Sequence, residues 1–158
     1  LATLSGVSST DAIRIQRLRG WRVARPIEFS YTAGRFLKAH GLALSSHVAG
    51  DFSGRGGLPD SAYLLVNSEG KRRLTMLAGG TVAYDAIFPQ LDLLARIPKA
   101  SFANIKWEVA PEAAPDGDAL LAVENANNPS ASLVLLRHGA RTYAARPADF
   151  TQIDLASQ

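Results

Sequence analysis

The chain has 158 residues, of which 47% are apolar and 20% are charged, and its net charge is +3 at pH 7. This size and composition favour a single globular domain over a disordered chain. Cysteine is missing from the sequence, which excludes disulfides, thiolate nucleophiles and cysteine-based zinc sites, and the longest apolar runs, such as residues 133–136, are too short to cross a bilayer.

The N-terminal part of the sequence carries the positive charge. Residues 1–50 hold seven Lys and Arg against two Asp and Glu, a net charge of +5, and the remainder carries −2. This asymmetry points to an acidic partner or an anionic surface, and a solvated basic face is the alternative. The sequence begins at Leu1 rather than Met, which a cleaved signal peptide or a trimmed domain would explain.

Residues 1–10 are small and polar, which is typical of a loose arm. Residues 11–19 fit either a short helix that Gly20 ends or a strand, because Ile13 and Ile15 alternate with polar residues. Both possibilities stay open.

A β-rich segment at 21–31 follows, in which Pro26 requires an edge position or a break. Residues 35–40 have the apolar spacing of a helix that ends at Gly41, and residues 42–48 predict a strand.

The second half of the sequence reads mostly as strands. A hairpin is predicted at 61–77, because the turn Asn67-Ser68-Glu69-Gly70 separates two apolar runs, and 82–87 predicts a third strand. Further predictions are a helix at 89–97, strands at 103–109, 119–124, 132–137 and 142–145, turns at 79–80 and 125–129, and a frayed tail at 149–158. We therefore predict one α+β domain over residues 1–158, with an antiparallel sheet from about Leu42 onward and one or two short helices packed on it.

The glycine-rich segment at 51–60 is the most informative motif. Calcium loops of the D-x-[DN]-x-D-G type place oxygen side chains at alternate positions, because calcium takes six to eight oxygen ligands. Asp51, Ser53 and Asp60 stand at suitable positions, but Arg55 replaces the central acid. We therefore expect no cofactor, with calcium as the alternative, and a turn in which Arg55 pairs with Asp51 or Asp60.

The order helix, strand, D-F-x-G-x-G-x-x-P-D, strand, Asn-x-x-Gly turn, strand resembles small secreted or periplasmic bacterial proteins with a single FG-GAP/VCBS-like calcium loop. The resemblance covers roughly residues 33–146 and includes the apolar strands at 118–124 and 131–139. It implies a periplasmic or secreted location. It also implies a role for which some similar proteins are known, the inhibition of cell-wall-degrading enzymes or immunity against them.

Other chemistries find little support in the sequence. His40, His47 and His138 lack the spacing of a zinc site, and no G-x-S-x-G elbow or phosphate-binding loop occurs. A small hydrolase remains as an alternative, with Asp51, Ser53, His47 and Asp60 around the loop, and a bond between His47 and Ser53 would favour it. A structural domain of a larger assembly is a third possibility, which a long exposed apolar edge would favour.

The preferred hypothesis is a non-enzymatic binding module. Its partner is expected to be another protein or an anionic component of the cell envelope, rather than a nucleic acid, because the arginine cluster matches no nucleic-acid-binding module. The candidate contact residues are Arg55 and Leu58 in the loop and Arg14, Arg17, Arg19 and Trp21 near the N-terminus.

Overall fold

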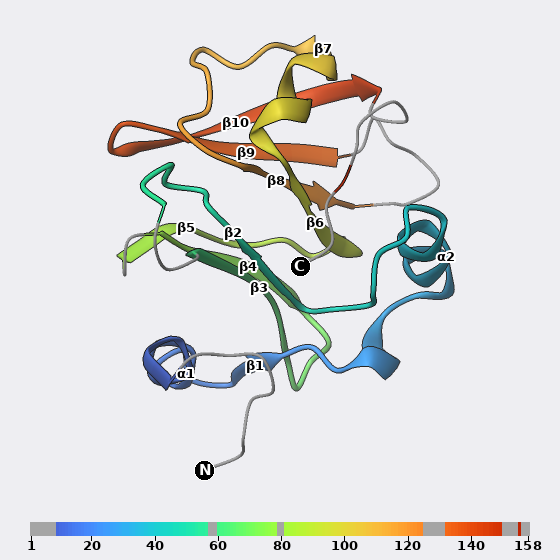
Figure 1. Cartoon of the computed structure of the whole chain (residues 1–158). Helices are drawn as coiled ribbons and strands as arrows, with labels where there is room; N and C mark the ends of the chain where they lie inside the picture. Colours follow the sequence, from blue (N-terminus) through green and yellow to red (C-terminus); the bar gives the residue numbers. More distant parts are fainter. Residues whose placement is uncertain (1–8, 57–59, 79–80, 125–131, 150–154, 156–158) are drawn as a thin grey trace.

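Two five-stranded antiparallel β-sheets pack face to face in this protein (Figure 1). The computed structural model describes residues 9–56, 60–78, 81–124, 132–149 and 155. The first sheet consists of β1 (Trp21–Val23), β2 (His47–Gly50), β3 (Asp60–Asn67), β4 (Arg72–Ala78) and β5 (Thr81–Ile87). The second contains, in spatial order, β6 (Leu93–Ile97), β8 (Ala119–Val123), β9 (Ser132–His138), β10 (Arg141–Asp149) and β7 (Lys106–Val109).

The strand β3 pairs with three other strands of the first sheet. One of its edges pairs with β4, and its other edge pairs with β2 over residues 60–63 and with β1 over residues 65–67. The loop after β2 therefore lies at the Asp60 end of β3, whereas β1 lies beside the Asn67 end. These two ends are roughly 23 Å apart, at about 3.3 Å per residue of strand.

Apolar side chains from both sheets fill the space between them. The fully buried members of this core include Leu64, Met76, Leu91, Leu120 and Leu135. Burial of this apolar surface is the main force that holds the two sheets together.

Helices cover both outer faces of the sandwich. The helix α1 (Ser9–Gln16) packs Ile15 against Tyr63, Leu65 and Leu77 of the first sheet. The helix α2 (Tyr31–Ala39) and the 3-10 helix η2 (Lys99–Asn104) lie against the second sheet, and a further 3-10 helix, η1 (Pro26–Glu28), precedes α2. The central strands β3 and β8 are therefore buried on both faces, which explains their uninterrupted apolar sequences.

Several predicted elements are confirmed. Ser30 caps the predicted helix α2 by accepting a hydrogen bond from the Ala33 amide. Residues 9–16, for which helix and strand were both left open, form a helix. The hairpin of β3 and β4 turns at Gly70 with a φ of 78°, and β5, β8, β9 and β10 cover four further predicted strands. The strand predicted at 103–109 is shortened to β7, because η2 extends to Asn104. In contrast, the segment 42–48 contributes only β2, and 21–31 contributes the short β1 followed by η1.

The predicted fold class is confirmed in part, and one predicted helix is wrong. The strands are antiparallel, as predicted, but they form two sheets, and strand content exceeds what an α+β domain with one or two helices implies. The helix predicted at 89–97 is a turn followed by β6. Leu93 and Leu94 lie on opposite faces of that strand and are both buried, so the segment lacks the alternation by which a strand is recognised. Of the tail that is predicted to fray, only Asp149 and Leu155 are described, and Leu155 packs against the cluster under α2.

The remaining predictions fall largely outside the described residues. They concern the loose arm at 1–10, of which only Ser9 and Thr10 are described, the turns at 79–80 and 125–129, and most of the tail. Within the described part of the chain, no helix is long and apolar enough to cross a bilayer.

Candidate functional site

The loop after β2 is fixed to the sandwich at its first residues. Phe52 is 1% exposed and inserts into the core between the sheets. The Asp51 carbonyl accepts hydrogen bonds from the Gly54 amide at 3.3 Å and from the Asp118 amide at 2.9 Å. The loop is thus joined both to itself and to the segment that leads into β8.

Asp118 is the main polar anchor of this end of the molecule. Its Oδ2 accepts hydrogen bonds from the Asp51 amide and from Arg96 Nη1, both at 3.1 Å, and its Oδ1 accepts one from the Lys99 amide at 3.1 Å. Gly50 leaves room for the Arg96 side chain, because a Cβ there would lie 2.7 Å from Arg96 Cδ. One carboxylate therefore links the loop, the end of β6 and the start of β8.

Two glycines allow the loop and the segment before β8 to touch through their backbones. A Cβ on Gly117 would lie 1.9 Å from the Asp51 carbonyl oxygen, and a Cβ on Gly54 would lie 2.3 Å from the Asp116 carbonyl oxygen. Asp116 in turn accepts a hydrogen bond from the Gly139 amide at 2.7 Å. The loop is therefore clamped through the 116–118 segment onto the β9–β10 turn.

The carboxylates within the loop bind backbone amides. Asp51 accepts from the Gly56 amide at 3.2 and 3.3 Å, and Asp60 accepts from the Ser53 amide at 2.8 Å. Nowhere in the described residues do three or more acidic or histidine side chains form a group that could hold a metal ion. The Asp51 and Asp60 carboxylates therefore bind loop amides, and they do not join a third acidic side chain as a calcium site requires within the described residues.

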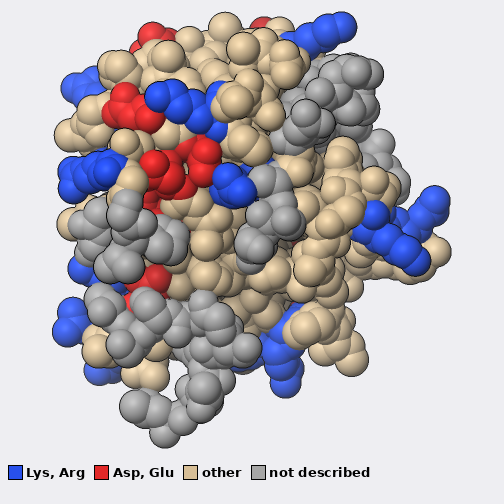
Figure 2. All heavy atoms as spheres, in the orientation of Figure 1, with Lys and Arg blue, Asp and Glu red and all other residues tan. Residues whose placement is uncertain are grey.

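The Arg55 side chain is exposed. No ion pair or hydrogen bond joins its guanidinium to any residue in the described part of the chain, so the predicted pairing with Asp51 or Asp60 is wrong. Asp51 and Asp60 each accept a hydrogen bond from a loop amide instead. Figure 2 shows acidic side chains grouped together and surrounded by basic ones on the side where Figure 1 draws this loop. Leu58, the other predicted loop contact, lies outside the described residues.

The N-terminal candidates do not join this site. Trp21 pairs with Asn67, at the end of β3 far from the loop, and the Arg73 guanidinium lies 5.3 Å from the centre of its ring. Arg17 and Arg19 are exposed, and Arg14 is half-buried on α1. The structure therefore places Trp21 at the opposite end of the first sheet from the loop, and it places α1, which carries Arg14, on the outer face of that sheet.

Two further N-terminal arginines are paired. Arg22 binds both oxygens of Glu28 at 2.5 and 2.7 Å, and Arg25 lies 3.4 Å from the same carboxylate. The hydrogen bond from Arg22 is the main reason why the pKa of Glu28 falls to about 2. The positive surface near the N-terminus is therefore smaller than the sequence suggests.

His47 forms a hydrogen bond with a serine other than the predicted one. Its Nε2 lies 2.9 Å from Oγ of Ser61, and its ring stacks on Tyr63, whose hydroxyl donates to Asp11 at 2.6 Å. No bond between His47 and Ser53 is found among the described residues, so the hydrolase that was centred on Ser53 gains no support. Ser61 is 8% exposed and lies within the ladder of β3, where its own backbone takes part in strand pairing.

The burial of His47 predicts a pH dependence of stability. Burial lowers its pKa below the ordinary 6.5, and the Asp11 carboxylate offsets part of this effect. The unfolded chain then binds a proton more readily than the folded chain, so stability is highest above pH 6.5 and falls as the pH drops toward the folded pKa. Urea unfolding at pH 7.5 and pH 5 should show a smaller loss for His47→Gln than for the wild type. An equal loss in both proteins would contradict the assignment to His47, since His40, whose pKa burial also lowers, is present in both.

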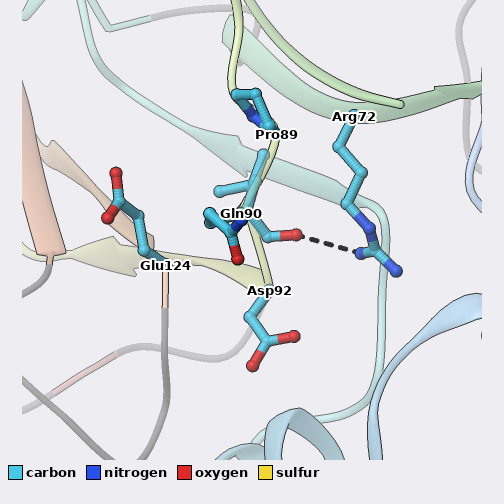
Figure 3. A pocket seen from close by; sticks show the side chains of 6 residues that line it. Arg72, Pro89, Gln90, Asp92 and Glu124 are labelled. Carbon is cyan, nitrogen blue, oxygen red and sulfur yellow. Dashed lines mark hydrogen bonds between the residues drawn. The ribbon is translucent and has the colours of Figure 1, made fainter. Parts of the chain in front are cut away.

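A cavity of 290 Å³ opens at the other end of the sandwich (Figure 3). It is lined by Arg72, Gln90, Asp92 and Glu124 together with Pro89 and Leu91. This cavity could not be predicted from the sequence, because its residues come from β4, from the turn between β5 and β6, and from the end of β8.

A long exposed apolar edge would favour a structural domain of a larger assembly, and the first sheet has a free edge within the described residues. β5 forms that edge, with Val82 and Ile87 each about half exposed. Part of the edge is covered, since Thr142 donates a hydrogen bond to the Ala83 carbonyl at 2.8 Å.

No protein family, curated protein or solved structure matches this chain, so its function has to be inferred from its own geometry.

Proposed function

We propose that this chain is a non-enzymatic binding module of the periplasm or the secreted fraction, of the inhibitor or immunity type. It engages a protein partner through Arg55 and the loop that carries it. The proposal does not depend on the N-terminal arginines Arg17 and Arg19.

The observation that supports this proposal is an exposed arginine, unpaired within the described residues, that directly follows the anchored residues 51–54. Phe52, Asp118 and the contact at Gly117 hold the loop backbone before any partner arrives. A fixed loop loses little conformational entropy on binding, and arginine is among the residues that contribute most at protein interfaces. A loop of this kind is suited to recognition.

The charges around Arg55 favour one kind of partner. A guanidinium binds a carboxylate through two parallel hydrogen bonds, so the partner should offer an aspartate or glutamate. Asp51, Asp116 and Asp118 lie in the same part of the molecule and would repel an extended polyanion. A protein with one well-placed carboxylate therefore fits better than an anionic polymer.

The test is capture of partners by purified wild-type protein and by Arg55→Ala from an envelope extract, followed by titration calorimetry with the captured protein. Arg55→Ala should bind at least about tenfold more weakly, since a residue that dominates an interface contributes about 2 kcal/mol or more. Arg17→Ala is the matched control, because it also removes an exposed arginine but lies outside the loop. Equal affinity of Arg55→Ala and the wild type would rule out the loop as the contact.

A further inference from the structure

The cavity of 290 Å³ lies far from Arg55, at the end of the sandwich where β3 passes into β4. Arg72 begins β4, Glu124 follows β8, and Gln90 and Asp92 belong to the turn that crosses from the first sheet to the second. The cavity is near the lower end of the range for ligand sites, so a ligand that fills it is small.

The polar groups around this cavity are only partly satisfied by the protein. Arg72 donates Nη1 to the Leu91 carbonyl at 3.0 Å and Nη2 to the Glu28 carbonyl, which leaves three of the five guanidinium N–H groups. Asp92 accepts one hydrogen bond, from the Ser30 hydroxyl at 2.9 Å. The side chains of Gln90 and Glu124 have no hydrogen bond or ion pair with any described residue.

Charges of opposite sign stand on opposite sides of the cavity. Figure 3 shows Arg72 on one side and Glu124 on the other, with Gln90 between them and Asp92 at one end. Neither carboxylate forms an ion pair with a Lys or Arg within the described residues. A ligand with a single charge would satisfy one side and leave the other unpaired.

We propose that this cavity binds a small zwitterion, of which a free α-amino acid is the simplest example. The ammonium group of the ligand lies toward Glu124 and Asp92, its carboxylate lies toward Arg72, and the Gln90 amide can donate to or accept from either group. Charge-assisted hydrogen bonds of this kind are the strongest available in a polar, partly buried site. The site is independent of the loop, so it stands whether or not Arg55 binds a partner.

The experiment is a titration of the ¹⁵N-labelled protein, followed by amide resonances, with glycine, L-lysine and L-glutamate as probes. The amides of residues 90–92 and 124 should shift and approach saturation in the millimolar range with at least one of these zwitterions. Sodium acetate and methylammonium chloride each carry one half of the charge pattern. They should shift the same amides at least about tenfold less at equal concentration, because each meets only one side of the cavity.

Glu124→Gln tests the ammonium side, with Glu108→Gln as the matched control, since Glu108 is an exposed glutamate on β7. Glu124→Gln should weaken zwitterion binding at least about tenfold, and Glu108→Gln should leave it unchanged. Arg72 is not replaced, because its bonds to two backbone carbonyls hold the surrounding segments. The proposal is overturned if no zwitterion shifts these amides at tens of millimolar. It is also overturned if methylammonium shifts them as strongly as glycine, or if Glu124→Gln binds like the wild type.

Discussion

Gly117→Ala is expected to lower the free energy of unfolding by about 3 kcal/mol or more, or to prevent folding. The new Cβ would lie 1.9 Å from the Asp51 carbonyl oxygen and 2.8 Å from the Gly54 amide nitrogen. Both are backbone atoms that cannot rotate away, so the loop and the segment before β8 would have to separate. Urea denaturation of both proteins measures the difference.

Gly56→Ala provides the matched control within the same loop. Gly56 has a φ of 69°, but a Cβ there meets no atom within 4 Å. This substitution costs only the left-handed backbone conformation, about 1 kcal/mol. If Gly117→Ala destabilised the protein no more than Gly56→Ala, the close approach of the two segments would be wrong.

Local sequence signals predicted the elements whose structure depends on neighbouring residues. The hairpin of β3 and β4 follows from the turn at Gly70 between two apolar runs, and α2 follows from its apolar spacing between Ser30 and Gly41. In each case the residues that decide the structure lie within a few positions of each other, so no knowledge of the rest of the fold is required.

Long-range packing decided the features that the sequence did not predict. The β6 sequence was predicted as a helix because its residues do not alternate between apolar and polar. Apolar residues stand on both of its faces because β6 is buried between the other sheet and the outer helices. Asp118 pairs with the loop across 67 residues, and Arg96 reaches it from a third segment. The run Asp116-Gly117-Asp118 before an apolar strand was visible in the sequence, but nothing local indicates which loop it meets.

Composition likewise could not reveal which charges are available for binding. Seven basic residues in the first fifty suggest one basic surface, yet Glu28 pairs with two of them. Arg55 is still predicted to contact a partner. The reason for this prediction is now the exposure of its side chain rather than the sequence motif. The motif suggested an arginine that replaces a metal, and the structure shows a loop closed by its own amides with the arginine left exposed.

Asp118→Ala is expected to lower the free energy of unfolding by about 3 kcal/mol. The side chain is 15% exposed, and its loss leaves Arg96 Nη1 and the amides of Asp51 and Lys99 without their acceptor. Asp118→Asn keeps one acceptor oxygen and should cost roughly half as much. Glu112→Ala, an exposed residue of the preceding linker, should change stability by less than about 0.5 kcal/mol. An Asp118→Ala protein as stable as Glu112→Ala would show that this carboxylate does not anchor the loop.

Asp118→Ala also separates the rigidity of the loop from the chemistry of Arg55. Under conditions where the variant remains folded, the Gly54 amide should exchange with deuterium faster than in the wild type, because the Asp118 anchor of the loop is lost. Binding of the partner through Arg55 should then weaken although Arg55 itself is unchanged, since the loop would have to be ordered on binding. Faster exchange with undiminished affinity would mean that Arg55 acts without a preformed loop, and that the clamp at Gly117 and Asp118 serves stability alone.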